Sequence, residues 1–430
     1  MKLTKNTGET RWRSRRQLEE HSTEFRRELI RVTEGVYVAV GFDESNASMI
    51  EGDDGMIVID TLLATEAAKI VLREFRRVTT KPVRGIIYTH SHMDHISGAT
   101  VFAGEGNPDI FSRAPFSPEK ISPLQPILMR REARQFGRHL PSKDIINRGL
   151  APGKAPTGGF GKGYIPPNRT FKSKRLKTNM AGVKIILVAA PGETDDQLYA
   201  WLPEKKVLFC GDNYYKVFPN LYAIRGTTYR DVRQWADSLD EMSRLGADFL
   251  VPGHTRPVSG RGRIKENLEN YRDAILAVYH QTIEEMNRGL TPDELVEVVK
   301  LPSHLADKPY LQEFYGAVPW AVRSIYNGHL GWFDGNPTNL FPLSPREESR
   351  RLAIIAGGEI KLMNHLKKSI QQKDWQWACR LADHIMALND KQSGEARKLK
   401  IKVLRALSEI QINAPARNYY LSCARELALR

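Results

Sequence analysis

Short apolar runs separated by turn residues recur along the chain as far as about residue 260. They lie at residues 36–40, 56–60, 85–88, 183–188, 207–210 and 249–251. Their length and their content of Val, Ile and Leu predict β-strands. Two of the runs are almost unbroken, which is typical of strands covered on both faces. Apolar residues at helical spacing over 64–77 predict an amphipathic helix, so the pattern of this part is α/β.

The pattern changes to helices after residue 264. Apolar residues recur every three or four positions from Leu268 to Met286, and Gly289 follows as a stop signal. Thr291 and Ser344 each precede a proline and have glutamate three positions on, which is typical of helix N-termini. We therefore expect helices to predominate after residue 264.

The last 85 or so residues, 346–429, predict helices only. Two of these helices, at 374–388 and 395–407, resemble one tetratricopeptide-type hairpin. One hairpin cannot bury its own apolar face. We therefore expect this segment to pack against the rest of the chain or against a second subunit.

These patterns divide the chain into three parts. Residues 1–30 are highly charged and predict an N-terminal arm, residues 31–264 form the α/β domain, and residues 265–430 form a helical domain. The Gly- and Pro-rich stretch 149–169 lacks the Gly-Lys-Ser/Thr ending of a phosphate loop. It predicts a mobile lid or an insertion.

Length and composition describe an ordinary globular protein: 430 residues, 41% hydrophobic and 27% charged, enough for two or three domains. No apolar run approaches the ~18 residues of a membrane span, and no apolar leader follows Met1. The three cysteines are far apart and predict buried free thiols. We expect a chain that starts near Met1, has no membrane span and lies in the cytoplasm.

The formal net charge of +14 is compatible with three functions. A basic surface binds nucleic acid, steers a smaller anion, or only keeps the protein in solution. Basic residues gather at 11–16, 130–131 and 172–175, without the repeated aromatic residues of a single-strand platform. We therefore expect no nucleic-acid partner, although the charge alone does not decide.

The segment His90-Ser91-His92-Met93-Asp94-His95 directly follows the apolar run at 85–89. It places three imidazoles and a carboxylate within six positions. Zinc takes nitrogen and oxygen ligands of this kind, and open catalytic sites use three protein ligands and a water. A chance cluster of solvated histidines is the alternative, but spacing this dense favours a metal.

Other predicted strands end in residues that bind metals. Glu193, Asp212 and His254 each follow a glycine at a strand end, and Asp60 ends the run that begins at residue 56. Each of these alone is more often a turn, cap or structural residue. Together with the first segment they predict a site for two metal ions, with Asp60 as a partner of a ligand histidine.

At this point the sequence resembles the metallo-β-lactamase superfamily, whose signature is His-x-His-x-Asp-His at one strand end, and within it the alkyl sulfatases. Glu193 stands where lactamases and glyoxalases generally have histidine, which favours the sulfatase branch. Asp212 stands where the best-studied branch has glutamate. The sequence given has no counterpart of the sterol-carrier-like domain that follows in many alkyl sulfatases, which weakens the expectation of a long-chain detergent as the substrate. The resemblance covers about residues 30–429 and is carried by 89–95, 191–194, 211–213, 220–226, 326–337, 374–378 and 417–421.

The resemblance implies an αββα sandwich at 31–264, followed by an all-helical dimerisation domain at 265–430 and thus a homodimer. It also implies two zinc ions, with manganese as the alternative. By position, one metal is held by His90, His92 and Glu193, the other by Asp94, His95 and His254, and Asp212 bridges them.

The implied activity is hydrolysis of organic (alkyl) sulfate esters by a hydroxide that forms between the metals, with Asp94 and Asp212 as catalytic ligands. Arg225, thirteen positions after Asp212, matches the family's sulfate-binding arginine, whose guanidinium grips two oxygens and assists catalysis. Tyr164 and Tyr326 are candidates for lining the substrate pocket. The alternatives are a hydrolase of another ester class on the same fold (β-lactam, lactone, thioester, or phosphodiester including nucleic acid) and a non-catalytic dimeric binding protein.

Overall fold

The computed structural model describes residues 8–118, 124–154, 158–388 and 391–429, and it divides into two compact units. Residues 21–126 and 149–329 form the first, here called the sheet unit. The second, here called the helical unit, consists of residues up to 20, 127–148 and 330 onwards.

The first sheet of the sheet unit has seven strands in sequence order within the described residues. Neighbouring strands from β1 to β4 are antiparallel, whereas neighbouring strands from β4 to β7 are parallel. The strands are β1 (Glu28–Thr33), β2 (Val36–Val40), β3 (Ala47–Glu51), β4 (Met56–Ile59), β5 (Val83–Ile87), β6 (Asp109–Arg113) and β7 (Arg169–Phe171).

The second sheet of this unit has six strands among the described residues, in the order β13-β12-β11-β10-β9-β8. All neighbours are antiparallel except β11 and β12, which are parallel. The strands are β8 (Arg175–Met180), β9 (Val183–Ala189), β10 (Leu198–Leu202), β11 (Val207–Gly211), β12 (Phe249–Pro252) and β13 (Val258–Ser259).

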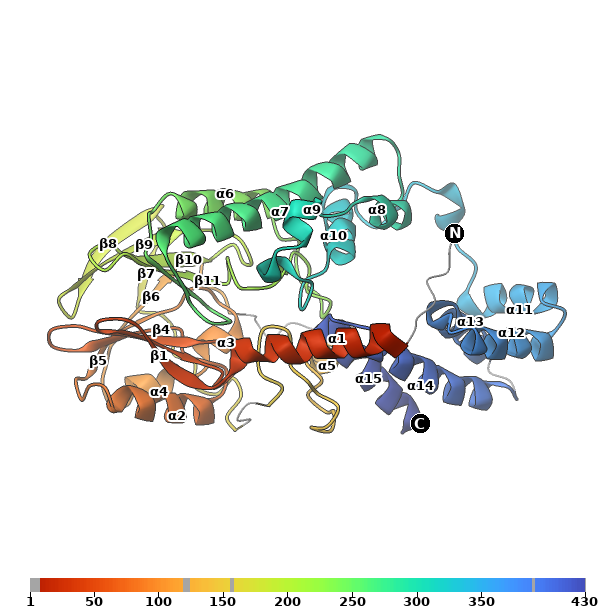
Figure 1. Cartoon of the computed structure of the whole chain (residues 1–430), viewed down its shortest axis with the longest axis horizontal. Coiled ribbons are helices and arrows are strands. Elements are labelled where there is room, and N and C mark those ends of the chain that lie inside the picture. The colour runs from red at the N-terminus through yellow and green to blue at the C-terminus, as the bar shows by residue number, and fades with distance from the viewer. Residues whose placement is uncertain (1–7, 119–123, 155–157, 389–390, 430) are drawn as a thin grey trace. The chain divides into compact units, whose positions relative to one another are not determined.

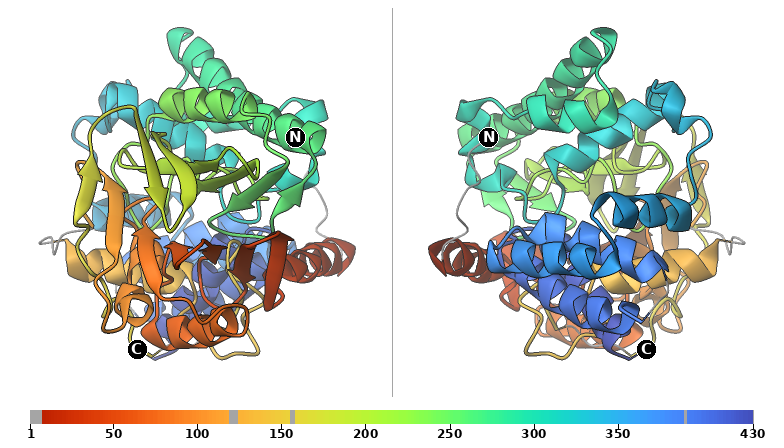
Figure 2. Two further views of the ribbon diagram at one scale, coloured as in Figure 1. Left: turned by 90° about the vertical axis from the view of Figure 1, so that its left-hand side faces the viewer. Right: turned by 90° about the vertical axis from the view of Figure 1, so that its right-hand side faces the viewer.

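Helices cover the outer face of each sheet, which gives four layers (Figures 1 and 2). Alternate residues of β4 point to opposite faces, as the strand period requires. Ile57 and Ile59 join the core between the sheets, whereas Met56 and Val58 join the core under α2 and α4. The helices of this unit are α2 (Thr65–Arg76), α3 (Met93–Ile96), α4 (Ala99–Ala103), α6 (Val232–Ser243), α7 (Arg261–Asn287), α8 (Pro292–Val298), α9 (Ser303–Ala306) and α10 (Val318–Leu330), with 3-10 turns at Ser22–Phe25 and Pro309–Leu311.

The helical unit consists of helices, four of which build one apolar core. Leu366, Leu381 and Leu407 from three different helices lie in this core. Ser344 caps α11 as the sequence predicts, since its hydroxyl accepts from the Glu347 amide. The helices are α1 (Gly8–His21), α5 (Gln125–Gln135), α11 (Pro345–Ile355), α12 (Glu359–Gln371), α13 (Trp375–Leu388), α14 (Ser393–Glu409) and α15 (Ala414–Ala428), with a 3-10 turn at Pro337–Asn339.

The predicted αββα sandwich and the helical C-terminal part are confirmed. Helices α7 to α10 group with the sheets although residue 264 was the expected boundary, because the apolar stripe of α7 packs against α6 and β12. The expected arm contains helix α1, whose Leu18 is buried and accepts from Asn147 through its carbonyl. The three-part division at 30 and 264 stays a prediction.

Part of the Gly- and Pro-rich stretch 149–169 lies close to the helices of the first sheet. Of the stretch expected to be a mobile lid or insertion, residues 158–163 hydrogen-bond to the scaffold: the amides of Thr65 and Thr100 donate to Gly159 and Gly163. These contacts place the glycines at the beginnings of α2 and α4.

Across the described ranges, none of the helices combines the length and the apolar character that crossing a bilayer needs.

Replacing Phe209 in β11 by alanine should destabilise the sheet unit. Its ring lies in the core between the sheets and is 2% exposed, so the change leaves a cavity that costs about 3–5 kcal/mol. The free energy of unfolding in denaturant measures this loss. Lys177→Ala on the exposed side of β8 is the control and should stay within about 0.5 kcal/mol. Equal stability of both variants would contradict the assignment of this core.

Candidate metal centre

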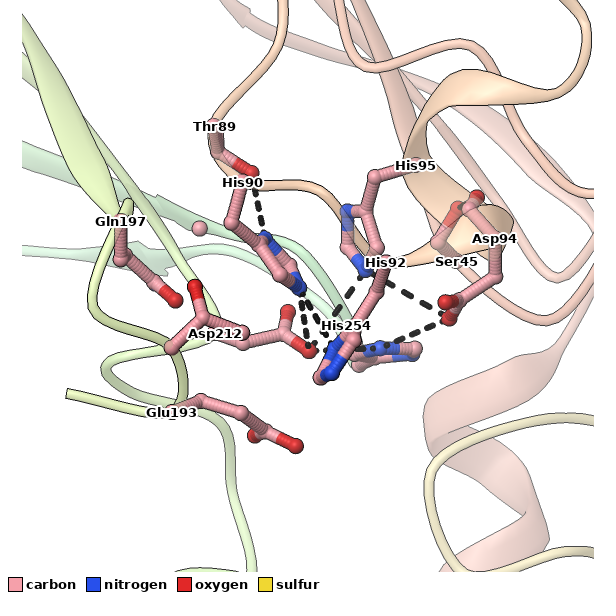
Figure 3. A network of polar contacts seen from close by, with 12 residues as sticks. Ser45, Thr89, His90, His92, Asp94, His95, Glu193, Gln197, Asp212 and His254 are labelled. Carbon is pink, nitrogen blue, oxygen red and sulfur yellow. Dashed lines mark hydrogen bonds and ion pairs between the residues drawn. The ribbon is translucent and has the colours of Figure 1, made fainter. Parts of the chain in front are cut away.

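Residues from both sheets meet at one edge of the sheet unit (Figure 3). His90 and His92 follow β5, while Asp94 and His95 lie in the short helix α3. Asp212 follows β11, and His254 follows β12. The parallel pairs β4–β5 and β11–β12 end at this edge, as expected for the carboxyl ends of parallel strands.

A glycine before His254 lets the backbone approach the other residues closely. A Cβ atom on Gly253 would lie 2.3 Å from Oδ1 of Asp212 and 2.9 Å from Cε1 of His95. Such contacts are too short for any larger residue, so glycine is required at this position. The predicted pattern of glycine followed by a metal-binding residue thus has a steric reason here.

The donor atoms gather into two groups. In the first, His90, His92 and Asp212 each offer an atom within 4.8 Å of the others. Nε2 of His90 lies 2.9 Å from Nδ1 of His92 and 3.8 Å from Oδ2 of Asp212. The sequence places the same two histidines at one metal.

The second group consists of Asp94, His95 and His254, again within 4.8 Å of one another. The Nε2 atoms of both histidines approach Oδ2 of Asp94, at 3.4 Å for His95 and 3.5 Å for His254. They also lie 3.5 and 3.1 Å from Oδ2 of Asp212. Asp212 therefore stands between the two groups, in the place that the sequence analysis gives to a bridging carboxylate.

Hydrogen bonds behind the site orient three of the imidazoles. Nδ1 of His95 donates to Oδ2 of Asp60 at 2.8 Å, which is the partnership that the sequence predicts for Asp60. The Thr89 hydroxyl also donates to Asp60, so it accepts from Nδ1 of His90 at 3.0 Å. Nδ1 of His254 donates to the Glu44 carbonyl at 2.8 Å. Each Nε2 is thereby left facing the site, which is the usual arrangement of histidines that bind a metal.

The donor set fits a pair of divalent cations. Nε2 of His95 and Oδ1 of Asp212 are buried and have no hydrogen-bond partner in the described part of the protein. Buried polar atoms without partners are rare in native proteins, and here they converge with other nitrogen and oxygen atoms. Four imidazoles and several carboxylates are the ligands of zinc and related transition metals.

The protonation of the histidines differs between the two groups. Burial lowers the pKa values of His90 and His92, and the positive charges of Arg225 and Arg230 lower that of His92 further. Burial also acts to lower the pKa of His254, but Asp212 and Asp94 outweigh it and raise the value to about 9. Without metal, these two carboxylates thus favour the protonated form of His254.

Glu193 lies beside these groups but outside both of them. Its Oε1 pairs with Nη1 of Arg230 at 2.8 Å, and its Oε2 accepts from the Tyr215 hydroxyl at 3.1 Å. Burial raises the pKa of Glu193, and Arg230 opposes this shift. An ionised carboxylate has about four lone pairs, so these contacts leave room for a metal. Its role as a ligand stays a prediction.

The predicted substrate residues lie in different surroundings. Arg225 is half-buried, and its charge acts on His92 and Tyr315. Tyr164 packs near Tyr88 in the core between the first sheet and its helices, and these contacts give no support for a place in the pocket. Tyr326 is buried in α10. The substrate roles of all three stay predictions.

Sequence reasoning missed several residues that support the site. Arg230 and Tyr215 hold Glu193, and the Ser45 hydroxyl donates to the Asp94 carbonyl. Tyr315 is buried, which raises its pKa, and the charges of Glu193 and Arg225 also act on it. The one available signal was the position of Arg230, five residues after Arg225 in the same segment.

Sequence profiles of two known families match the chain. The metallo-beta-lactamase superfamily matches residues 40–254, which is half of the chain. Alkyl sulfatase dimerisation matches residues 291–429.

The linear primary-alkylsulfatase of Pseudomonas sp. (strain ATCC 19151) is 39% identical over 390 residues, which are 88% of this chain and 73% of the relative. The (R)-specific secondary-alkylsulfatase of Pseudomonas sp. is 31% identical, over 93% of this chain and 62% of the relative. The alkyl/aryl-sulfatase of Saccharomyces cerevisiae is also 31% identical, over 93% of this chain and 64% of the relative. The chain thus spans about two thirds of the length of these relatives.

The structure of the stereoselective inverting sec-alkylsulfatase Pisa1 from Pseudomonas sp. superposes with a TM-score of 0.86 and 29% identity. The match covers 97% of this chain and 67% of that one. Both the sequence profiles and this similarity across nearly the whole chain place the protein in one family. The chain belongs to the alkyl sulfatase family of the metallo-β-lactamase superfamily.

Proposed function

We propose that the protein hydrolyses organic (alkyl) sulfate monoesters in a reaction that depends on two zinc ions, with manganese as the alternative. One observation carries the proposal: two groups of imidazoles and carboxylates meet around Asp212, beside Arg225 and Arg230. The imidazoles and carboxylates suit cations, and the two arginines suit a substrate that is always an anion. The alkylsulfatase relatives support this substrate class.

His90, His92 and Asp212 would hold one metal, together with Glu193, and Asp94, His95 and His254 would hold the other. When bound, such a pair lowers the pKa of water towards neutrality and offsets negative charge that develops on the ester. Asp60 and Thr89 keep the ligand histidines oriented. Glu44 does the same for His254 through its backbone.

Arg225 would bind the sulfate group of the substrate. A guanidinium can donate two parallel hydrogen bonds to two sulfate oxygens, and it stays charged at all working pH values. Its charge acts directly on His92, so the anion would lie near the first group. A neutral lactone or thioester would gain much less from this charge, which favours the sulfate ester over those classes.

The helical unit would hold a homodimer. A run of large apolar side chains is exposed there, and monomers seldom leave this many apolar residues in water. They belong to the segment that matches alkyl sulfatase dimerisation. They are Trp332, Phe341, Leu343, Ile354, Ile355 and Ile360, between 48 and 95% exposed.

We also propose a cytoplasmic location. Cys210, Cys379 and Cys423 are all free thiols, which is typical of proteins in a reducing compartment.

Protein prepared without chelators should contain about two zinc ions per chain, as measured by elemental analysis. His92→Ala and His254→Ala should each lose one of them, because each change removes a ligand from a different group. His280→Ala, on an exposed part of α7, is the control and should keep both. A wild type with one ion or none, or a His254→Ala variant that keeps two, would show that the ligands are assigned wrongly.

Arg225→Ala should lower kcat/KM for an alkyl sulfate roughly a hundredfold, since it removes charge-assisted hydrogen bonds to the anion. Activity on a neutral ester should change much less. Arg244→Ala, on the exposed end of α6, controls for the general loss of positive charge. An equal fall on both substrates would mean that Arg225 does not bind the anion.

The double variant Phe341→Asp with Ile355→Asp should shift the protein from dimer to monomer in analytical ultracentrifugation. Charged groups at these positions would have to be buried in the dimer, at a high cost. Val298→Asp places a charge at a half-exposed position of the sheet unit and should leave the dimer intact. A monomeric wild type, or a double variant that remains fully dimeric, would contradict the proposed interface.

A further inference from the structure

Arg230 is a buried arginine next to the metal-binding groups. It precedes Asp231, the N-cap residue of α6, and it is 3% exposed. Burying a guanidinium is costly unless each of its donors has a partner. The partners of its separate nitrogen atoms therefore indicate what this residue does.

One end of the Arg230 guanidinium is held firmly. Nη1 pairs with Oε1 of Glu193 at 2.8 Å and donates to the Asn220 carbonyl. These two contacts fix the position and the plane of the group. They use only one of its three nitrogen atoms.

The other edge of Arg230 has no partner. Nε and Nη2 are buried, and neither has a hydrogen bond within the described ranges. In a guanidinium these two nitrogens present parallel N–H groups that match two oxygens of one anion. Arg134 uses the same edge in this protein: its Nε and Nη2 donate to the two oxygens of Glu426 at 2.8 and 2.6 Å.

The unpartnered edge belongs to a residue that lies near the predicted substrate position. Arg230 and Arg225 both act on the His92 ring, and both act on the buried Tyr315. Two guanidiniums thus act on the same part of the site. An anion with several oxygens suits such a place, since the unpartnered edge of Arg230 can donate to two of them at once.

We propose that the Nε–Nη2 edge of Arg230 binds two oxygens of the sulfate group, alongside Arg225. This assignment rests on the proposed function, because it gives that substrate a second guanidinium. The leaving inorganic sulfate would use the same edge. Phosphate has the same tetrahedral shape, so the chemistry recognised is that of a tetrahedral oxyanion, and the experiment separates the two anions.

A purely structural role for Arg230 would be to hold Glu193 alone. Arg230→Lys separates the roles, since an ammonium can still pair with Glu193 but offers no parallel edge. Arg134→Lys is the matched control: it removes the same kind of edge where Glu426 already occupies it.

Calorimetric titration of the metal-loaded protein with inorganic sulfate tests the proposal. Arg230→Lys should weaken sulfate binding about tenfold or more at unchanged metal content, whereas Arg134→Lys should bind as the wild type does. Sulfate affinity equal to the wild type in Arg230→Lys, or no binding to the wild type, would overturn the proposal. Phosphate binding that depends on Arg230 in the same way would support the edge and extend it to oxyanions in general.

A crystal of the wild type soaked in sulfate gives a second test that needs no variant. Sulfate oxygens should lie within hydrogen-bond distance of Nε and Nη2 of Arg230, and sulfate bound elsewhere would overturn the proposal. Activity of the wild type on a panel of alkyl sulfates is measured separately. Arg230-dependent sulfate binding without hydrolysis would refute the proposed function and leave this assignment standing. Hydrolysis of alkyl sulfates by the wild type, together with unchanged sulfate binding in Arg230→Lys, would refute this assignment and leave the proposed function standing.

Discussion

The structure depends on burying several charged and polar side chains together at the ends of strands from two different sheets. Asp212 is the centre of this arrangement, because its carboxylate lies within 4 Å of a donor atom of His90, His95 and His254. Burial of such groups is costly without compensation. A pair of cations would offset the carboxylate charge and give the unpartnered atoms of His95 and Asp212 their partners.

The same demand for compensation explains the basic residues around the centre. Glu193 is buried, and its charge is paired with that of Arg230 rather than with solvent. The charges of Arg225 and Arg230 also both act on His92. Groups that would bind cations and groups that would bind an anion therefore lie side by side, which is the arrangement that the proposed hydrolysis of an anionic ester needs.

Much of the site could be predicted from the sequence because strand ends are visible there. The candidate ligands around β5, β11 and β12 follow apolar runs directly, so their convergence follows from the fold. Strands such as β1 and β8 were missed, since their half-exposed residues lack a continuous apolar run. The grouping of α7 with the sheets could not be predicted, because its apolar stripe predicts a helix without indicating which element it packs against. Arg230 was missed because the sequence does not show whether an arginine is buried or exposed.

The account rests on two metal ions held by residues from distant parts of the chain. Anomalous diffraction from crystals of the zinc-loaded protein tests this most directly. It should show two peaks, one among His90, His92 and Asp212 and the other among Asp94, His95 and His254. A single peak, no peak, or zinc bound away from these residues would contradict the account.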